Sequence, residues 1–454
     1  MENHISNHLE NEGGTFMRPL FDKLNRAGVR YCVLRNYEEL PYSTGGSDVD
    51  MWVHVDDLAL CEALLKETSK ETNMPLVSFY DAPTQYKVCY MGIEDGVQFD
   101  IFKGNVYWTN RIMFSGASIE ANTIMHGGVK VLSEDFADIQ ALIKELIYTN
   151  DCREKYIDKI YQSTTFTIDY LSKYLECFDV VFLNTLYQAI SKKAIKQDIQ
   201  ILGALARKNI KKEHSVSKIC YLFSKFKRLK RRPGYVICVE GTDGSGKSFI
   251  IESIEPMLNG AFHNKVIYNH LRPNVFPDIA VLFGKRESDK VVKVVSSPHE
   301  GKTSGSLVSL LRVSYYMLDY TLGYIKKVLP QINTRYHVFI FDRYFYDYYF
   351  DSKRSKVNLP QWILKLFEIL VPSPDVILCL GGDPNKIYER KPETSLSEVT
   401  RQTEELKRFC NSRNSAFWID TTLEKEESIK QAMNAIISVM EERFKNINYT
   451  GHNK

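Results

Sequence analysis

The sequence predicts an α/β protein in which a parallel sheet lies between helices, preceded by a small α+β domain and a helical middle region. From Gly234 onward short apolar runs alternate with helical patterns, which is typical of a parallel sheet wrapped by helices. Between about residues 133 and 230, Gly and Pro are scarce and apolar residues recur at helical spacing. The first 132 residues mix short strand-like runs with helices. These observations divide the chain into residues 1–132, 133–232 and 233–454.

The individual elements follow from the same patterns. In the first domain, strand-like runs lie at residues 31–34, 49–55, 86–90 and 97–102. In the middle region, apolar residues at i, i+3 and i+4 predict helices; an example is the set Ile139, Leu142, Ile143, Leu146 and Ile147. In the last domain, we expect strands at residues 235–239, 265–268, 338–341, 376–380 and 416–419, with helices that include 307–328 and 429–440.

A basic run precedes the last domain and indicates a domain boundary. It is followed by Pro233 and Gly234 and consists of Lys225, Lys227, Arg228, Lys230, Arg231 and Arg232. Such a run can contact a polyanion or an anionic membrane surface, but a solvated linker is the favoured interpretation.

Composition narrows the class of protein. A chain of 454 residues, 44% hydrophobic and 25% charged, is typical of two or three ordinary globular domains. The net charge of +3 gives no reason to expect a nucleic-acid partner. The nine cysteines include no C-x-x-C pair, so we expect reduced thiols and a cytoplasmic location. No run approaches the length of a membrane span, and the N-terminus lacks an apolar signal core.

The segment YVICVEGTDGSGKS carries the strongest functional signal. It matches G-x-x-x-x-G-K-[ST] between a strand-like run and a helical pattern, the context that a phosphate-binding loop requires. Its backbone N–H groups are expected to hold the phosphates of ATP, Lys247 to neutralise them, and Ser248 to help bind Mg²⁺. The predicted nucleotide-binding residues are Gly241, Thr242, Asp243, Gly244, Ser245, Gly246, Lys247 and Ser248.

Further charged residues follow the other strands of this domain. Asp342 and Arg343 follow one strand, where Asp342 is expected to hold Mg²⁺ and Arg343 to meet phosphate, unless both belong to a surface turn. Arg272 follows another strand and is either a clamp for an acceptor phosphate or a turn residue. Three cations in a later segment are candidates for a lid that closes over the transferred phosphoryl group, or for a solvated helix–loop–helix: Arg390, Lys391 and Arg401.

These motifs together resemble the thymidylate kinase family of P-loop kinases. The matching segments are residues 240–248, the DRY motif at residues 342–344, residues 372–391 and the IDTT segment at residues 419–422. The resemblance implies transfer of the γ-phosphoryl group of ATP with Mg²⁺ to a nucleoside monophosphate such as dTMP. It also implies that Arg343 and Arg272 contact the acceptor phosphate, and it allows a homodimer.

The chain departs from that family around the acceptor site. Arg272 is followed directly by Pro273 and then by a long insertion. After the DRY motif comes a segment rich in tyrosine and basic residues. Its members either shape a pocket for another small phosphorylated acceptor or are core aromatics beside a solvated turn: Tyr346, Asp347, Tyr348, Arg354 and Lys356.

The N-terminal domain carries a second candidate site. Asp48 and Asp50 follow a Gly-Gly-Ser turn and share one face of a predicted strand, and Asp100 lies on a later strand. Three neighbouring carboxylates repel one another unless a cation is present, and divalent metals with oxygen ligands meet that need. A solvated turn is the alternative. Arg35, which lies between the first two strand-like runs, is either a phosphate ligand or a surface residue.

This pattern resembles the polymerase-β-like nucleotidyltransferases. Gly46, Ser47, Asp48, Asp50 and Asp100 match the family's Gly-Ser, Asp-x-Asp and distant Asp. The resemblance implies two Mg²⁺ ions on the aspartates and a triphosphate on Gly46 and Ser47; a non-catalytic version of the fold is also consistent with it.

Three functions remain open from the sequence. The leading one is an ATP-dependent phosphotransferase of the thymidylate kinase type in the C-terminal domain. The second is a metal-dependent nucleotidyltransferase at the three aspartates, with the P-loop domain auxiliary. The third is a non-catalytic scaffold in which ATP orders the insertion at residues 273–306.

Overall fold

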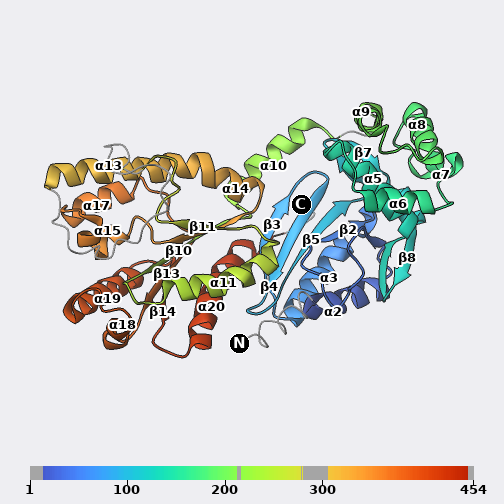
Figure 1. The fold of residues 1–454 in the computed structure, drawn as a ribbon. Coiled ribbons are helices and arrows are strands. Elements are labelled where there is room, and N and C mark those ends of the chain that lie inside the picture. The colour runs from blue at the N-terminus through green and yellow to red at the C-terminus, as the bar shows by residue number, and fades with distance from the viewer. Residues whose placement is uncertain (1–13, 212–215, 278, 280–304, 448–454) are drawn as a thin grey trace. The chain divides into compact units, whose positions relative to one another are not determined.

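The computed structural model describes residues 14–211, 216–277, 279 and 305–447, and the chain forms two compact units (Figure 1). Unit 2 is Arg228–Lys445, and unit 1 is the rest of the described chain. Among the described helices, none combines the length and the apolarity that a bilayer crossing requires.

Unit 1 is built on a seven-stranded mixed sheet with the order β3-β4-β5-β2-β1-β9-β8. Strand β2 pairs in parallel with β5, and β1 pairs in parallel with β9, whereas the other neighbours are antiparallel. The strands are β1 (Tyr31–Val33), β2 (Val49–Val53), β3 (Leu76–Asp81), β4 (Gln85–Met91), β5 (Gly96–Lys103), β8 (Thr123–His126) and β9 (Val129–Leu132), with a separate hairpin of β6 (Val106–Trp108) and β7 (Arg111–Phe114).

Helices cover both faces of this sheet. Alternate strand residues point to opposite faces, so Tyr31 packs against Phe21 of α2 (Gly14–Arg26), while Cys32 and Trp52 join the core of the helical region. This core includes residues of the helices that follow residue 133 in the chain. The helical region and this face of the sheet therefore share one hydrophobic core. The remaining helices are α3 (Leu58–Glu71), α4 (Gly116–Ala121), α5 (Glu134–Tyr148), α6 (Glu154–Gln162), α7 (Ile168–Tyr174), α8 (Val180–Ser191) and α9 (Ile199–Asn209).

The four strands predicted for the first domain are confirmed as β1, β2, β4 and β5. Strands β3, β6, β7, β8 and β9 were not predicted. The last two are only four residues long, which is too short for alternation to separate a strand from a turn.

Unit 2 contains an all-parallel five-stranded sheet with the order β11-β12-β10-β13-β14. All five predicted strands are confirmed, and the strand before the phosphate-loop motif is the central one. The strands are β10 (Tyr235–Gly241), β11 (Val266–His270), β12 (Val338–Asp342), β13 (Val376–Gly381) and β14 (Ala416–Asp420).

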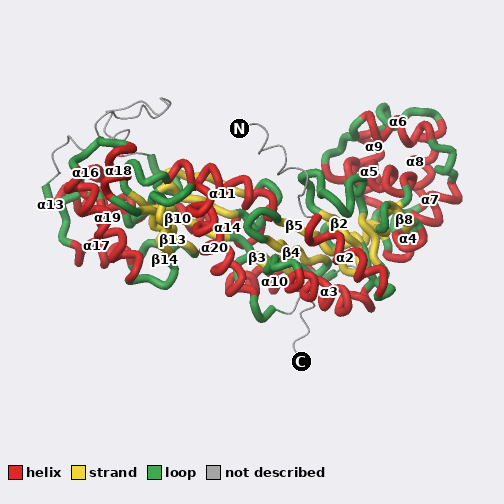
Figure 2. The backbone as a smooth tube through the Cα atoms, turned by 90° about the horizontal axis from the view of Figure 1, so that it is seen from below, coloured by secondary structure: helices red, strands yellow, loops and turns green. Residues whose placement is uncertain are grey.

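Helices flank this sheet on both faces (Figure 2). Val236 and Cys238 of β10 face a core shared with α13 (Ser306–Gly323) and α19 (Leu396–Asn411). The alternate residue Tyr235 contacts Phe262 of α11 (Lys247–Phe262) and donates a hydrogen bond to α20 (Lys425–Phe444). A π-helical turn, Tyr324–Val328, follows α13, and the other helices are α14 (Leu329–Thr334), α15 (Asp347–Phe350), α16 (Ser352–Ser355), α17 (Gln361–Glu368) and α18 (Pro384–Arg390).

The basic run differs from the expected linker. Its residues up to Lys230 belong to helix α10 (Lys218–Lys230), and the division between the two units falls inside that helix, between Lys227 and Arg228. Apolar residues spaced at i, i+3, i+4 and i+7 alternate with the lysines there, and this helical period explains why the segment is not an extended linker.

Candidate functional site

The loop between β10 and α11 has the backbone of a phosphate-binding loop. Gly244 and Gly246 both have a φ of +82°, in the left-handed region that favours glycine. A Cβ at Gly244 would lie 2.7 Å from the carbonyl oxygen of Ile387, and a Cβ at Gly241 would collide with the Ser245 hydroxyl. The local geometry therefore requires the glycines that the motif contains.

Lys247 opens helix α11 and folds back over the loop. Its Nζ donates hydrogen bonds to the carbonyl oxygens of Gly241, at 2.9 Å, and Thr242, at 2.8 Å. Burial and the neighbouring Arg343 guanidinium lower the pKa of Lys247 to about 7, although Asp243 and Asp342 act in the opposite direction. The ammonium is thus poorly compensated where it stands, and an anionic ligand would stabilise it.

The polar groups of this loop are suited to binding a polyphosphate. The hydroxyls of Thr242 and Ser245 are buried and have no hydrogen-bond partner among the described residues. The first N–H groups of α11, which begins at Lys247, have no acceptor within their own helix. Buried donors without partners are costly, and phosphate oxygens would satisfy them.

Asp342 ends strand β12 beside this loop. Its carboxylate meets Nδ1 of His270 and the hydroxyl of Tyr268, each at 3.2 Å, while its Oδ1 is buried without a partner among the described residues. The pKa of Asp342 is lowered: burial opposes ionisation, but the hydrogen bond from His270 and the charge of Lys247 outweigh it. An ionised oxygen with no partner is a suitable ligand for Mg²⁺, with Ser248 as the hydroxyl ligand on α11.

Arg343 connects the DRY motif to the phosphate loop. Its side chain is buried, and its backbone has the left-handed conformation, with a φ of 68°. Its guanidinium donates to Asp347 at 2.7 Å and to Asp243 of the loop at 2.6 Å. Arg354 donates to both oxygens of Asp243 at 2.8 Å, so two arginines converge on one carboxylate. The surface-turn alternative for Arg343 is therefore wrong, because its side chain is 3% exposed.

Glu240 is a residue of this site to which the sequence assigned no role. It is fully buried, its Oε1 accepts the Tyr344 N–H at 2.8 Å, and its Oε2 has no partner among the described residues. Burial and then Asp347 raise its pKa to about 8. The available signal was an acidic residue near the end of an otherwise apolar strand.

Arg272 is also buried, but its charge is already balanced within unit 2. It donates to Asp319 of α13 at 2.8 Å and lies over the ring of Tyr316, 4.3 Å from the centroid. The carboxylate of Asp319 also accepts the N–H groups of Val275 and Phe276. Most of the insertion at residues 273–306, which the scaffold hypothesis concerns, lies outside the described residues.

The three lid candidates lie in different surroundings. Lys391 packs next to the phosphate loop, since its Cβ is 3.1 Å from the position that a Cβ at Gly244 would take. Arg390 donates to the carbonyl oxygen of Thr421 at 2.8 Å. Arg401 is held by Glu398 and Glu405 on its own helix and by the carbonyl oxygen of Phe350.

The aromatic segment after the DRY motif is mostly core. Tyr346 is buried in the core of unit 2, and Tyr348 packs against that core. Asp347 and Arg354 belong to the ion-pair network of Arg343 and Asp243, whereas Lys356 is exposed. The structure thus favours core aromatics for the two tyrosines.

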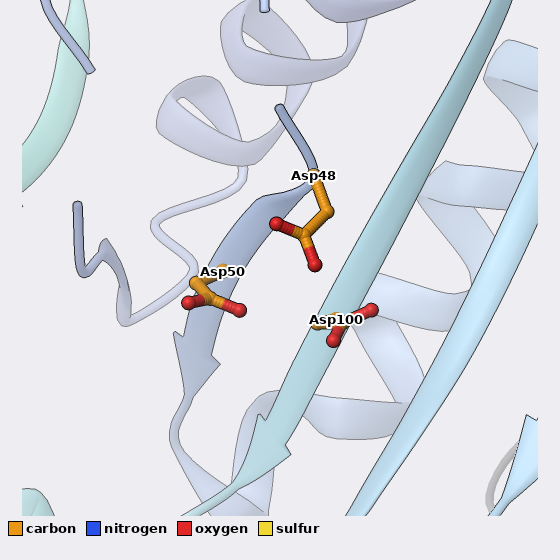
Figure 3. Close-up of side chains that lie close together, drawn as sticks. All are labelled: Asp48, Asp50 and Asp100. Carbon is orange, nitrogen blue, oxygen red and sulfur yellow. The ribbon is translucent and has the colours of Figure 1, made fainter. Parts of the chain in front are cut away.

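In unit 1 the three predicted aspartates come together, as Figure 3 shows. Strands β2 and β5 are parallel neighbours in a register that places Asp50 opposite Asp100, and Asp48 precedes β2 on the same face. One oxygen from each carboxylate lies within 4.8 Å of the others. Burial raises the pKa of Asp100 against the opposing effect of Lys87, and Asp50 raises it further. The solvated-turn alternative is therefore wrong, because the side chains of Asp48, Asp50 and Asp100 are only 11%, 7% and 6% exposed.

Basic side chains already contact this cluster. Arg35 pairs with Asp50 and, at 3.1 Å, with Asp48, while Lys87 pairs with Asp100. Lys144 of α5 is also close: burial and Arg35 lower its pKa, whereas the aspartates raise it. The carboxylate oxygens suit Mg²⁺, but an incoming ion has to displace Arg35 and Lys87 from the oxygens they occupy.

Comparisons with known proteins add little to this description. No protein-family model and no curated protein matches the sequence. Among solved structures, the chain is similar to the thymidylate kinase from Ehrlichia chaffeensis, with 15% identity and a TM-score of 0.30, over 46% of this chain and 100% of that one. A TM-score of 0.30 is too low to assign a function to this chain.

Proposed function

We propose that unit 2 is an ATP- and Mg²⁺-dependent phosphotransferase that phosphorylates a nucleoside monophosphate, dTMP first, or a related small phosphate acceptor. One observation carries the proposal. A glycine loop carries two buried hydroxyls and a partly buried lysine, and it lies beside an ionised aspartate with one buried oxygen; neither the hydroxyls nor that oxygen has a hydrogen-bond partner among the described residues. These groups match the charges and hydrogen-bond acceptors of a metal-bound triphosphate.

The roles of the residues follow from their positions. The loop N–H groups and the hydroxyls of Thr242 and Ser245 hold phosphate oxygens, and Lys247 adds positive charge. Ser248 and Asp342 hold Mg²⁺, which neutralises charge on the phosphates when bound. Phosphoryl transfer needs no covalent intermediate, so positioning and electrostatics account for catalysis.

The acceptor side is proposed to depend on two buried arginines. Arg343 is directed at the loop by Asp243 and Asp347, and Arg272 is fixed by Asp319. Preformed ion pairs fix the direction of both guanidinium groups before an acceptor arrives, which lowers the entropy cost of binding a phosphate.

The test is ADP release by the purified full chain with Mg-ATP. The acceptors are dTMP, other nucleoside monophosphates, sugar phosphates and buffer alone. Lys247→Ala is expected to abolish release, whereas Lys430→Ala, at an exposed lysine on α20, serves as the matched control and is expected to retain it. Release with dTMP that is lost only in Lys247→Ala supports the proposal. ATP binding without turnover on any acceptor contradicts it and favours the scaffold.

A second candidate function is supported by the aspartate cluster of unit 1. Three buried carboxylates with oxygens within 4.8 Å of one another are suited to a divalent metal and to nucleotidyl transfer. This activity releases pyrophosphate, not ADP, so the two products separate the candidates.

Pyrophosphate release from each nucleoside triphosphate in the presence of Mg²⁺ or Mn²⁺ tests this candidate. Asp48→Ala with Asp50→Ala is expected to abolish it, and Lys247→Ala to leave it unchanged. Pyrophosphate release that persists in the double variant contradicts a role for the aspartates.

A further inference from the structure

Helix α10 exposes a continuous apolar face. Its apolar residues recur at i, i+3, i+4, i+7 and i+10, the spacing of one side of a helix. Their exposed fractions range from 46% to 70%, and they are Ile219, Leu222, Phe223, Phe226 and Leu229. Two phenylalanines and three aliphatic side chains on one exposed helical face exceed what scattered surface residues produce.

Residues on the opposite side of α10 make hydrogen bonds that fix the helix. The hydroxyl of Tyr221 donates to the carbonyl oxygen of Thr109 at 2.7 Å in unit 1. Arg228, seven residues later and on the same side, is buried and donates to the carbonyl oxygen of Asn333 in unit 2. Polar contacts therefore secure the back of α10 and leave its apolar face outward.

Positive charge surrounds this face. Lys218 is the first residue of the helix, Lys230 is the last, and Arg231 follows it; all three are exposed. Lys225 and Lys227 add charge along the sides, the latter 3.8 Å from Asp81. The described part of the helix, KICYLFSKFKRLK, contains no acidic residue.

We propose that α10 docks on an anionic lipid bilayer, lying in the plane of the interface with its apolar face in the headgroup region. Bulky apolar side chains on one face, flanked by cations and lacking acids, are the chemistry of interfacial helices. A nucleic acid is disfavoured because the outward face offers apolar groups where a phosphate backbone needs cations. The proposal does not depend on the function proposed for either site.

The test is binding of the full chain to vesicles of phosphatidylcholine alone or with about one-third phosphatidylglycerol. Cys220 is the one exposed cysteine of the nine, all of which lie in the described residues, so it takes an environment-sensitive fluorophore on α10. A blue shift and co-sedimentation with the anionic vesicles are expected, with both lost at high salt. Phe223→Glu with Phe226→Glu is expected to weaken binding about tenfold or more. Replacing Lys218 and Lys230 with glutamine is expected to weaken it about fivefold for each cation.

Trp362→Glu with Leu366→Glu on α17 is the matched control, because these residues are similarly exposed but lie outside α10. It is expected to bind vesicles as the parent chain does. No shift with anionic vesicles, equal binding to neutral ones, or equal loss in the α17 variant overturns the proposal. Light scattering that shows a dimer dissociated by the Phe223 and Phe226 changes also overturns it, since a second copy then covers the face.

Discussion

Binding of a nucleotide to unit 2 is expected to take up a proton at Lys247 above neutral pH. In the free protein the pKa of Lys247 is about 7, lowered by burial and Arg343 against Asp243, Asp342 and Asp347. A bound polyphosphate restores the charged form, so the pKa rises toward the ordinary value of a lysine. At about pH 9 only about one molecule in a hundred carries the proton beforehand, so affinity falls about a hundredfold from its value at about pH 6, or about 2.7 kcal/mol.

Isothermal titration calorimetry with Mg-ADP measures this directly. At about pH 8, titrations in buffers of different ionisation enthalpy are expected to report uptake of nearly one proton. Lys247→Arg is the control, because a guanidinium stays protonated and removes this uptake while any contribution from the nucleotide remains.

Two results would refute the reasoning. Affinity that is constant between about pH 6 and pH 9 shows that Lys247 is already charged in the free loop. Proton uptake that persists unchanged in Lys247→Arg assigns the proton to another group.

Three further outcomes are expected. The pKa of Glu240 is raised to about 8, so the stability that its protonated form contributes is fully present below the ordinary pKa of a glutamate and is lost as the pH rises through about 8. Denaturant titrations are expected to show this loss in the parent chain and not in Glu240→Gln. Gly244→Ala is expected to lower the free energy of unfolding by about 2–4 kcal/mol, because the new Cβ meets both a left-handed φ and the backbone. Gly246→Ala has the same φ but only ordinary contacts, so thermal unfolding is expected to show a loss of about 1–2 kcal/mol. Saturating Mn²⁺ is expected to stabilise unit 1 by about 2–3 kcal/mol, and Asp48→Asn with Asp50→Asn to remove this shift; an unchanged shift argues against a metal at the aspartates.

The strands of both sheets that position the sites were predictable, because each is a distinct apolar run. The register of β2 against β5 was not, yet it is this register that sets Asp50 opposite Asp100. Similarly, the phosphate loop followed from its glycines, whereas the partners of its Asp243, namely Arg343 and Arg354, are a hundred residues or more away. Local patterns report the conformation of a segment, but not which distant segment packs on it.

The amino-acid sequence alone predicts the two candidate sites, since glycine spacing, Lys247 and the aspartate pattern are local properties. The charge state and the partners of those groups depend on the tertiary structure. Burial lowers the pKa of Lys247 and raises that of Glu240, and packing pairs Arg272 with Asp319. It also leaves the apolar face of α10 exposed. These properties depend on solvent exclusion and on contacts between segments far apart in the chain, which no local pattern specifies.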